Sequence, residues 1–240
     1  MGTLIFGLAG ALAFLSGLAL DLDWLCFISK PIPVIALLIW LRRAPAGAYR
    51  RWIAIGLVLS LLGDMLLEWP ADLFVFGLGA FLLAHLAYLR AYLLDTRRLA
   101  PLALLVAAGC GAAIFALLAS GGLGALLVPV ACYALAISAM LWRALARLGH
   151  DLDRQSALLA AGGAALFVVS DSLIGINRFV SPFSGASYLI ILSYWLGQWG
   201  IAASVVAMLS SVPSRKNRQR HPGKSAIANR RTLKRGACNG

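Results

Sequence analysis

Charged residues are scarce in this chain of 240 residues, where they make up 12%, and only nine of them are acidic. Hydrophobic residues make up 61%, and the mean hydropathy is +0.87. In ordinary soluble domains about a quarter of all residues are charged, and most of these lie on the solvated surface. The shortage of charge therefore excludes an ordinary soluble domain and predicts a polytopic membrane protein.

Cysteine is also scarce, and the signatures of several hydrolase classes are missing. The four cysteines, Cys26, Cys110, Cys132 and Cys238, show no CxxC spacing, which argues against a disulfide framework and a metal site. The chain has no GxSxG, HExxH or P-loop motif. Nucleophilic-serine and metal-dependent hydrolysis therefore lack support, and we expect no metal site.

Eight apolar ranges are each close to the 20 or so residues that a helix needs to cross a bilayer. They are residues 3–20, 24–41, 52–69, 73–94, 99–119, 122–142, 156–176 and 187–210. The first range resembles a signal-peptide core, but no basic segment precedes it, and we expect it to span the membrane. The sequence predicts an all-α bundle of eight transmembrane helices over residues 1–212.

Basic residues are distributed unevenly among the connections. Of 21 Lys and Arg residues, 19 lie in the second, fourth and sixth connections or in the tail at 213–240. The positive-inside rule then places both termini in the cytoplasm, and we expect a multi-pass protein of the bacterial inner membrane. The tail, with nine basic residues and no acidic one, is predicted to be disordered and to contact anionic membrane lipid. It carries most of the net charge of +12, so nucleic-acid binding is not expected.

Two aspartates, Asp64 and Asp171, lie inside the third and seventh apolar ranges. A carboxylate in hydrocarbon is costly and usually functional. With a rise of about 1.5 Å per helical residue, Lys30, Asp64 and Asp171 all lie roughly 7–9 Å below the outer boundary. We expect them to face one cavity that opens to the outer half of the bilayer, with the two carboxyls sharing a proton.

Other polar residues lie at depths from which they can face the same cavity. They are His85, Tyr88, Asn177, Arg178, Tyr194 and Gln198. Each has a structural alternative. Lys30 precedes Pro31 and Pro33, which are expected to interrupt the helix, so it can satisfy the freed carbonyls or pair with Asp64. The two aspartates can be structural ion pairs with Lys30 and Arg178. His85 and Tyr194 can be packing residues. Glu68 shares a helix face with Asp64, and the alternative for it is an exposed loop acid.

Two carboxyl groups in a low-dielectric site suit general acid and base catalysis, provided that one keeps its proton and a cation keeps the other ionised. That arrangement fits bonds whose cleavage passes through an oxocarbenium-like ion, as in glycosidic or vinyl-ether hydrolysis.

The order of short motifs resembles a known family. The motifs are Lys30-Pro31, Gly63-Asp64, His85-x-x-Tyr88, Ser170-Asp171-Ser172 followed by Asn177-Arg178-Phe179, and Tyr194-x-x-x-Gln198. They resemble the YhhN/TMEM86 family of integral-membrane lysoplasmalogenases, over nearly all of the chain up to about residue 210. The resemblance implies hydrolysis of the vinyl-ether bond of lysoplasmalogens without metal or cofactor. It also implies that Asp64 and Asp171 are the two catalytic aspartates.

In the mechanism that we expect, a protonated Asp171 donates to the enol-ether carbon, and Asp64 stabilises the resulting cation and activates water. Lys30, Asn177 and Arg178 would hold the phosphate of a lysophospholipid-type substrate. The remaining substrate-binding candidates, which would orient water or a carboxyl, are His85, Tyr88, Tyr194 and Gln198. A small-molecule or proton-coupled transporter and a purely structural membrane protein are the alternatives, because both also place charged residues within helices.

Overall fold

The computed structural model describes residues 2–149 and 153–208, which form helices joined by short turns and contain no strand. The α-helices are α1 (Gly2–Ala19), α2 (Asp23–Ser29), α3 (Ile32–Leu41), α4 (Ala48–Glu68), α5 (Phe74–Asp95), α6 (Pro101–Ser120), α7 (Leu127–Ala146), α8 (Arg154–Gly175) and α9 (Ala186–Ala207), of which α2 and α3 are short. Three short segments, η1 (Gly124–Leu126), η2 (Arg147–Gly149) and η3 (Ile176–Val180), continue or precede them. The predicted all-α class is confirmed. The predicted domain boundary at residues 212/213 lies outside the described residues.

Each of the eight predicted ranges coincides with a helix or, for the second range, with α2 and α3 together. By length and apolar composition, seven segments among the described residues can cross a membrane. Helix α4 is not among them, because every stretch of 18 residues within it contains three charged side chains. The multi-pass character is thus supported, while the count of eight spans and the cytoplasmic termini stay predictions.

The second range is broken at Lys30, as the following prolines predict. Helix α2 ends at Ser29, and α3 begins after Pro31 with a second proline in its first turn. Proline has no amide hydrogen and is tolerated in the first turn of a helix but not in its interior. The break places Lys30 between two short helices that together make one apolar rod.

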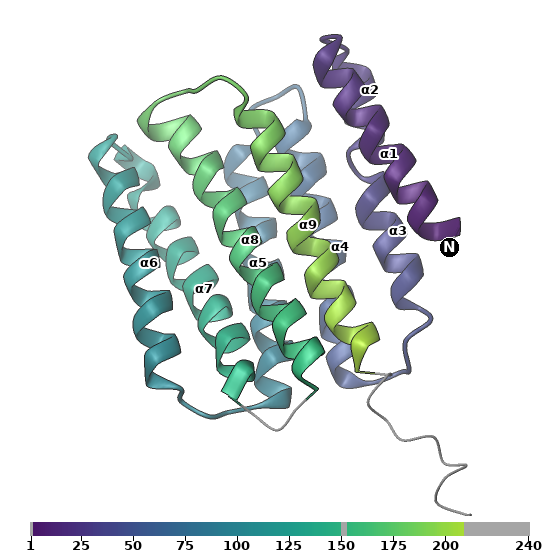
Figure 1. Ribbon diagram of the computed structural model, residues 1–240. Helices are drawn as coiled ribbons and strands as arrows, with labels where there is room; N and C mark the ends of the chain where they lie inside the picture. The colour runs from purple at the N-terminus through teal and green to yellow at the C-terminus, as the bar shows by residue number, and fades with distance from the viewer. Residues whose placement is uncertain (1, 150–152, 209–240) are drawn as a thin grey trace, which may run out of the picture. The chain divides into compact units, whose positions relative to one another are not determined.

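Neighbouring helices pack mainly in pairs. Helix α8 lies along α9, α4 along α5, α6 along α7, and α1 along α3. In Figure 1, α6 lies at one edge of the bundle and α1 at the opposite edge. Of the 20 residues of α6 only Ala107 and Leu118 are buried, so this helix has the weakest attachment to the core among the long helices.

Helices α8 and α9 approach each other through glycines. A Cβ atom built on Gly163 would lie 2.7 Å from the carbonyl oxygen of Gly197, and one built on Gly200 would lie 2.9 Å from the Cα of Gly163. Small residues let helix backbones pack closely where lipid supplies no hydrophobic driving force. This glycine contact fixes the two helices that carry Asp171 and Tyr194.

We expect Gly163→Ala to destabilise the protein by about 1–3 kcal/mol, because the added methyl group has no space between α8 and α9. The matched control is Gly162→Ala, one residue earlier in the same helix, where a Cβ atom would meet nothing within 4 Å. Apparent melting temperatures of the two purified variants in one detergent check this. A fall of equal size in both variants would contradict the assigned packing.

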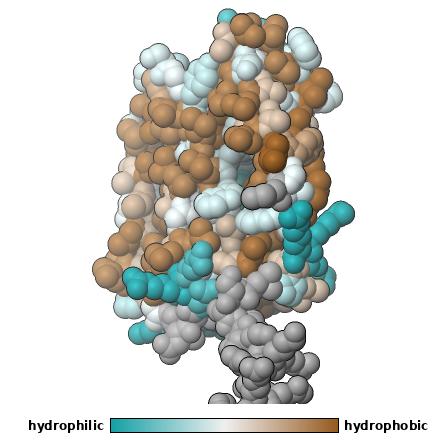
Figure 2. Space-filling view, turned by 45° about the vertical axis from the view of Figure 1, so that its right-hand side comes forward, coloured by the Kyte–Doolittle hydropathy of each residue, from teal (hydrophilic) through white to brown (hydrophobic). Residues whose placement is uncertain are grey.

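The arginine-rich connections gather at one end of the bundle. Arg98 donates to the carbonyl of Gly149 (2.9 Å), and Arg143 donates to the carbonyl of Arg98 (2.5 Å), so the fourth and sixth connections are linked directly. Figure 2 shows apolar residues over the upper and middle parts of one face and strongly hydrophilic residues at its lower end. The cavity described below lies toward the opposite end, since Asp64 and Glu68 come at the end of α4 and Arg50 and Arg51 at its beginning.

Candidate functional site

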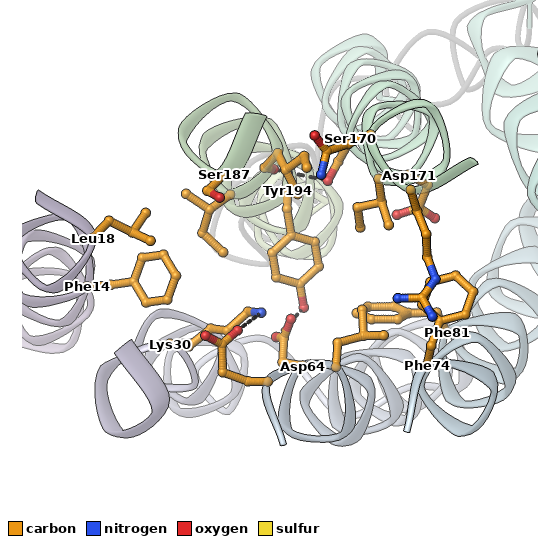
Figure 3. A pocket seen from close by; sticks show the side chains of 17 residues that line it. Phe14, Leu18, Lys30, Asp64, Phe74, Phe81, Ser170, Asp171, Ser187 and Tyr194 are labelled. Atoms are coloured by element: carbon orange, nitrogen blue, oxygen red, sulfur yellow. Dashed lines mark hydrogen bonds and ion pairs between the residues drawn. The ribbon is translucent and has the colours of Figure 1, made fainter. Parts of the chain in front are cut away.

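A polar cavity of about 270 Å³ lies between α1, the α2–α3 break, α4, α5, α8, η3 and α9. Figure 3 shows side chains from these elements pointing into it. Six of the nine predicted site residues line this cavity: Lys30, Asp64, Asp171, Asn177, Arg178 and Tyr194. Glu68, Ser170 and Ser187 also line it. The helix order therefore brings residues separated by up to 164 positions, Lys30 and Tyr194, to one site.

Asp64 is 2% exposed and lies one turn before the end of α4. The hydroxyl group of Tyr194, on α9, donates to its Oδ2 at 2.6 Å. The ring of Tyr194 is itself held edge-on by Phe81 and Phe167, at centroid distances of 5.9 and 5.4 Å. Aromatic packing thus fixes the donor that orients this carboxyl group.

Asp171, on α8, has different partners. Tyr133 of α7 donates its hydroxyl hydrogen to Oδ2, and His85 Nε2 of α5 lies 3.1 Å from the same oxygen. His85 Nε2 is also 2.8 Å from the Tyr133 hydroxyl, so the three groups form a closed triangle. The His85 ring packs edge-on against Phe167 and is wholly buried.

The two carboxyls that were expected to share a proton are not bonded to each other directly. Among the described residues no hydrogen bond joins Asp64 to Asp171, and each is bonded to a tyrosine of its own. Both carboxyls nevertheless line the same cavity, where Figure 3 places them apart from each other. They are two separately oriented groups.

The two cations of the cavity, Lys30 and Arg178, form ion pairs with acidic residues other than Asp64 and Asp171. Lys30 Nζ donates to Glu68 Oε2 at 2.6 Å, and among the described residues it forms no direct ion pair with Asp64. Glu68 is the last residue of α4 and the ion-pair partner of Lys30. The alternative that Glu68 is an exposed loop acid is therefore wrong. Arg178 donates to both carboxylate oxygens of Asp72, at 3.1 and 3.0 Å, and its guanidinium lies 4.0 Å from the ring centre of Phe74.

Three predicted site residues do not line the polar cavity: His85, Tyr88 and Gln198, all of them fully buried. The Tyr88 hydroxyl donates to Gln198 Oε1 at 2.7 Å and lies 3.3 Å from Ser60 Oγ, so these side chains bond to one another deeper in the bundle. Depth along each helix was predicted, but the direction of the side chain depends on helix rotation. Only His85 reaches the site, through Asp171.

Asn177 lines the cavity, and its Oδ1 accepts a hydrogen bond from the backbone N–H of Phe183 at 3.2 Å. This bond ties η3 to the loop that leads into α9. The Asn177 oxygen is therefore occupied, and its role includes holding the loop beside the cavity.

Tyr133 is the main residue that the sequence reasoning missed. It is the one long polar side chain in the apolar part of α7, whose sequence is otherwise Leu-, Val-, Ala- and Ile-rich. Its position, eleven residues inside the predicted span 122–142, is comparable in depth to that of His85 in its own span. The same depth argument that selected His85 would have selected Tyr133.

Comparisons with known proteins identify the family of the chain. A family model described as the YhhN family matches residues 25–205. A protein named lysoplasmalogenase from Mycobacterium tuberculosis is 42% identical over 149 residues, covering 57% of this chain and 53% of the relative. The chain therefore spans about half the length of this mycobacterial relative. No solved structure matches the chain.

The human relatives are covered more fully. Lysoplasmalogenase TMEM86B is 34% identical over 195 residues, 80% of each chain, and lysoplasmalogenase TMEM86A is 34% identical over 197 residues, 77% of this chain and 79% of the relative. The family match begins in α2 and runs into α9, so it includes every polar residue of the cavity. The chain belongs to the YhhN family.

Proposed function

We propose that this protein is a membrane hydrolase that cleaves the vinyl-ether bond of lysoplasmalogens to a fatty aldehyde and a glycerophospho-base. The relatives named lysoplasmalogenase support this reaction class. The observation that carries the proposal is the pair of carboxyls, Asp64 and Asp171, held in one membrane-embedded cavity by different partners. Cavities that hold two titratable groups in unlike surroundings are suited to paired acid and base chemistry.

We assign the base role to Asp171, the reverse of the assignment favoured from sequence. If His85 carries its hydrogen on Nε2, Tyr133 donates to Asp171 Oδ2 and the His85 N–H is shared between that oxygen and the Tyr133 hydroxyl, so two donors are in place to hold a carboxylate at this position. The other ring nitrogen, Nδ1, is buried without a partner, which fits the neutral Nε2–H tautomer because a second N–H would be left unsatisfied.

Asp64 is then the acid. It accepts a single hydrogen bond, is almost completely buried, and faces a lysine whose ammonium already pairs with Glu68. Burying a carboxylate costs free energy unless hydrogen bonds and an opposite charge offset it. With a single hydrogen bond and no direct ion pair among the described residues, the neutral, protonated form of Asp64 is the less costly one to bury.

The reaction follows in three steps. Asp64 donates its proton to the enol-ether carbon remote from oxygen, giving an oxocarbenium ion next to the Asp171 carboxylate. Water adds to the oxocarbenium carbon while Asp171 takes the proton of that water, giving a hemiacetal. On collapse, the hemiacetal hydroxyl returns a proton to Asp64 and Asp171 protonates the departing glycerol oxygen, so both carboxyls regain their starting forms.

Lys30 and Arg178 are proposed to hold the substrate phosphate at the mouth of the cavity. Each is already paired with a carboxylate, and an incoming phosphate would take the place of Glu68 beside Lys30 or of Asp72 beside Arg178. Arg178 is the more accessible, since 40% of its side chain is exposed against 13% for Lys30. With eight spans, cytoplasmic termini and a bacterial inner membrane, this mouth would face the outer leaflet.

The test is a comparison of lipids with one headgroup and one chain length, incubated with the purified protein. The vinyl-ether lysolipid is expected to release aldehyde, whereas the saturated ether and the ester are not. In D₂O the aldehyde, trapped at once as a hydrazone, is expected to carry one deuterium on the carbon next to the carbonyl, because the acid protonates that carbon. Absence of aldehyde from the vinyl-ether lipid would overturn the proposal.

A further inference from the structure

Asp171 borders three cavities, not one. Besides the polar cavity, two cavities of about 50 Å³ each adjoin Asp171 and Tyr133. One lies between α6, α7 and α8 and is called here the α6–α7 cavity; its walls include Phe115, Ile137 and Leu141. The other lies mainly between α5, α7, α8 and η3. Apart from Asp171, neither contains a charged residue.

The α6–α7 cavity adjoins the outer surface of the bundle. It shares Gly111, Phe115, Ala134 and Ser138 with an apolar groove of about 600 Å³ between α6 and α7. The groove and the cavity thus lie on two sides of the same four residues, one toward the lipid-facing side of these helices and the other at Asp171, and together they are called here the apolar route. At Gly111 the helices α6 and α7 are in close contact, because an added Cβ atom would overlap Ser138 Oγ.

Helix α6, which forms one wall of this route, is the long helix least embedded in the core. In Figure 1 it stands at the edge of the bundle, next to α7. A wall held by few buried side chains can shift at low cost, because local opening is easiest where few apolar contacts are lost. A cavity that is narrow in this structure can thus widen around a chain.

We propose that the α6–α7 cavity holds the hydrocarbon chain of the single-chain lipid substrate, and that its length and shape set the preference for chain length. This inference rests on the proposed function. The headgroup then occupies the charged cavity, the chain occupies the uncharged one, and the vinyl-ether bond that joins them lies at Asp171, where the two cavities meet. Apolar walls with a few placed polar groups are the usual composition of such ligand sites.

The polar cavity offers a competing route for the chain toward α1, past Phe14, Leu18 and Ile191. These side chains, however, line the same space as Lys30 and Glu68. A chain lying there would exclude the headgroup from its cations, so the uncharged cavity is the better place for it.

Substitutions at Gly111 test the inference. We expect Gly111→Leu to lower kcat/KM for a long-chain lysoplasmalogen about tenfold or more relative to a short-chain one, since filling an apolar pocket discriminates steeply between chain lengths. The matched control is Gly109→Leu on the open face of the same helix, where a Cβ atom meets nothing within 4 Å and the ratio should stay at the wild-type value. Ile137→Ala, which enlarges the cavity, should raise the ratio. An unchanged ratio in both Gly111→Leu and Ile137→Ala, or a change produced by Leu18→Trp instead, would overturn it.

A binding experiment separates failure of this inference from failure of the proposed reaction. A saturated, uncleavable ether lysolipid with a photoreactive diazirine at the end of its chain is irradiated with the wild-type protein, and the labelled peptides are identified. Labelling within residues 104–142 is expected, whether or not the vinyl-ether lipid is hydrolysed. Labelling confined to residues 2–20 or 186–207 would show that the chain leaves the site by the other route.

Discussion

Replacing Asp171 by Asn is expected to lower kcat for aldehyde release by about 10²–10⁴-fold, the usual range for loss of a positioned acid or base. The amide cannot take a proton from water, and it offers no negative charge to an oxocarbenium ion. Its oxygen can still accept from Tyr133, so the structural bond between α7 and α8 is kept. The measurement is single-turnover aldehyde formation by the purified variant, with its melting temperature recorded beside it.

Asp64→Asn is expected to be impaired to a similar degree, for loss of the proton donated to carbon. The matched control is Asp23→Asn, which removes an exposed carboxylate outside the cavity and should leave the rate unchanged. A folded Asp171→Asn protein within tenfold of the wild-type rate would rule out the assigned base.

The largest effect on stability is expected from Arg147→Met, a loss of about 3–5 kcal/mol, because it removes one partner of a buried ion pair. Arg147 is fully buried at the end of the bundle opposite the cavity. It lies 2.8 Å from Asp95 Oδ2 and donates to the hydroxyls of Tyr49 (2.7 Å) and Ser156 (2.9 Å). Its guanidinium also lies 5.5 Å from the ring centre of Tyr92.

For a chain of this size, such a loss corresponds to a fall of about 6–20 °C in the apparent melting temperature. Arg154→Met removes an exposed arginine at the same end of the bundle and serves as the control, with little change expected. Methionine matches arginine in length and flexibility, so packing is largely retained in both variants. If the apparent melting temperature of Arg147→Met lay within about 2 °C of that of the control, the buried Arg147 network would not make the expected contribution to stability.

Hydropathy was sufficient to locate the helices, because long apolar ranges in a chain with so little charge have few alternatives to membrane-spanning helices. Proline chemistry predicted the break at Lys30. Counting residues from the outer boundary predicted one level for Lys30, Asp64 and Asp171 and a cavity that Tyr194 can also face, and all four residues line one cavity. Depth is encoded in the sequence because the rise per helical residue is constant.

Side-chain partners were predicted less well, for a physical reason. Successive residues turn by about 100° around a helix, so two residues at one depth can point in different directions. Tyr88 and Gln198 lie at suitable depths yet turn toward each other, and Lys30 turns toward Glu68 in place of Asp64. These choices depend on helix rotations set by interhelical packing, such as the glycine contact between α8 and α9, which no single helix reveals.

The glycine contact between α8 and α9 makes tolerance to substitution differ between parts of the protein. Where backbones touch, no side chain can repack to absorb a displacement, so the spacing between Asp171 and Tyr194 is rigid. Helix α6, by contrast, has little buried surface to lose when it moves. We therefore expect substitutions to be poorly tolerated at Gly163, Gly197 and Gly200 and well tolerated along α6. Related proteins can then differ along α6, which forms one wall of the proposed chain site, while the spacing of Asp171 and Tyr194 stays the same.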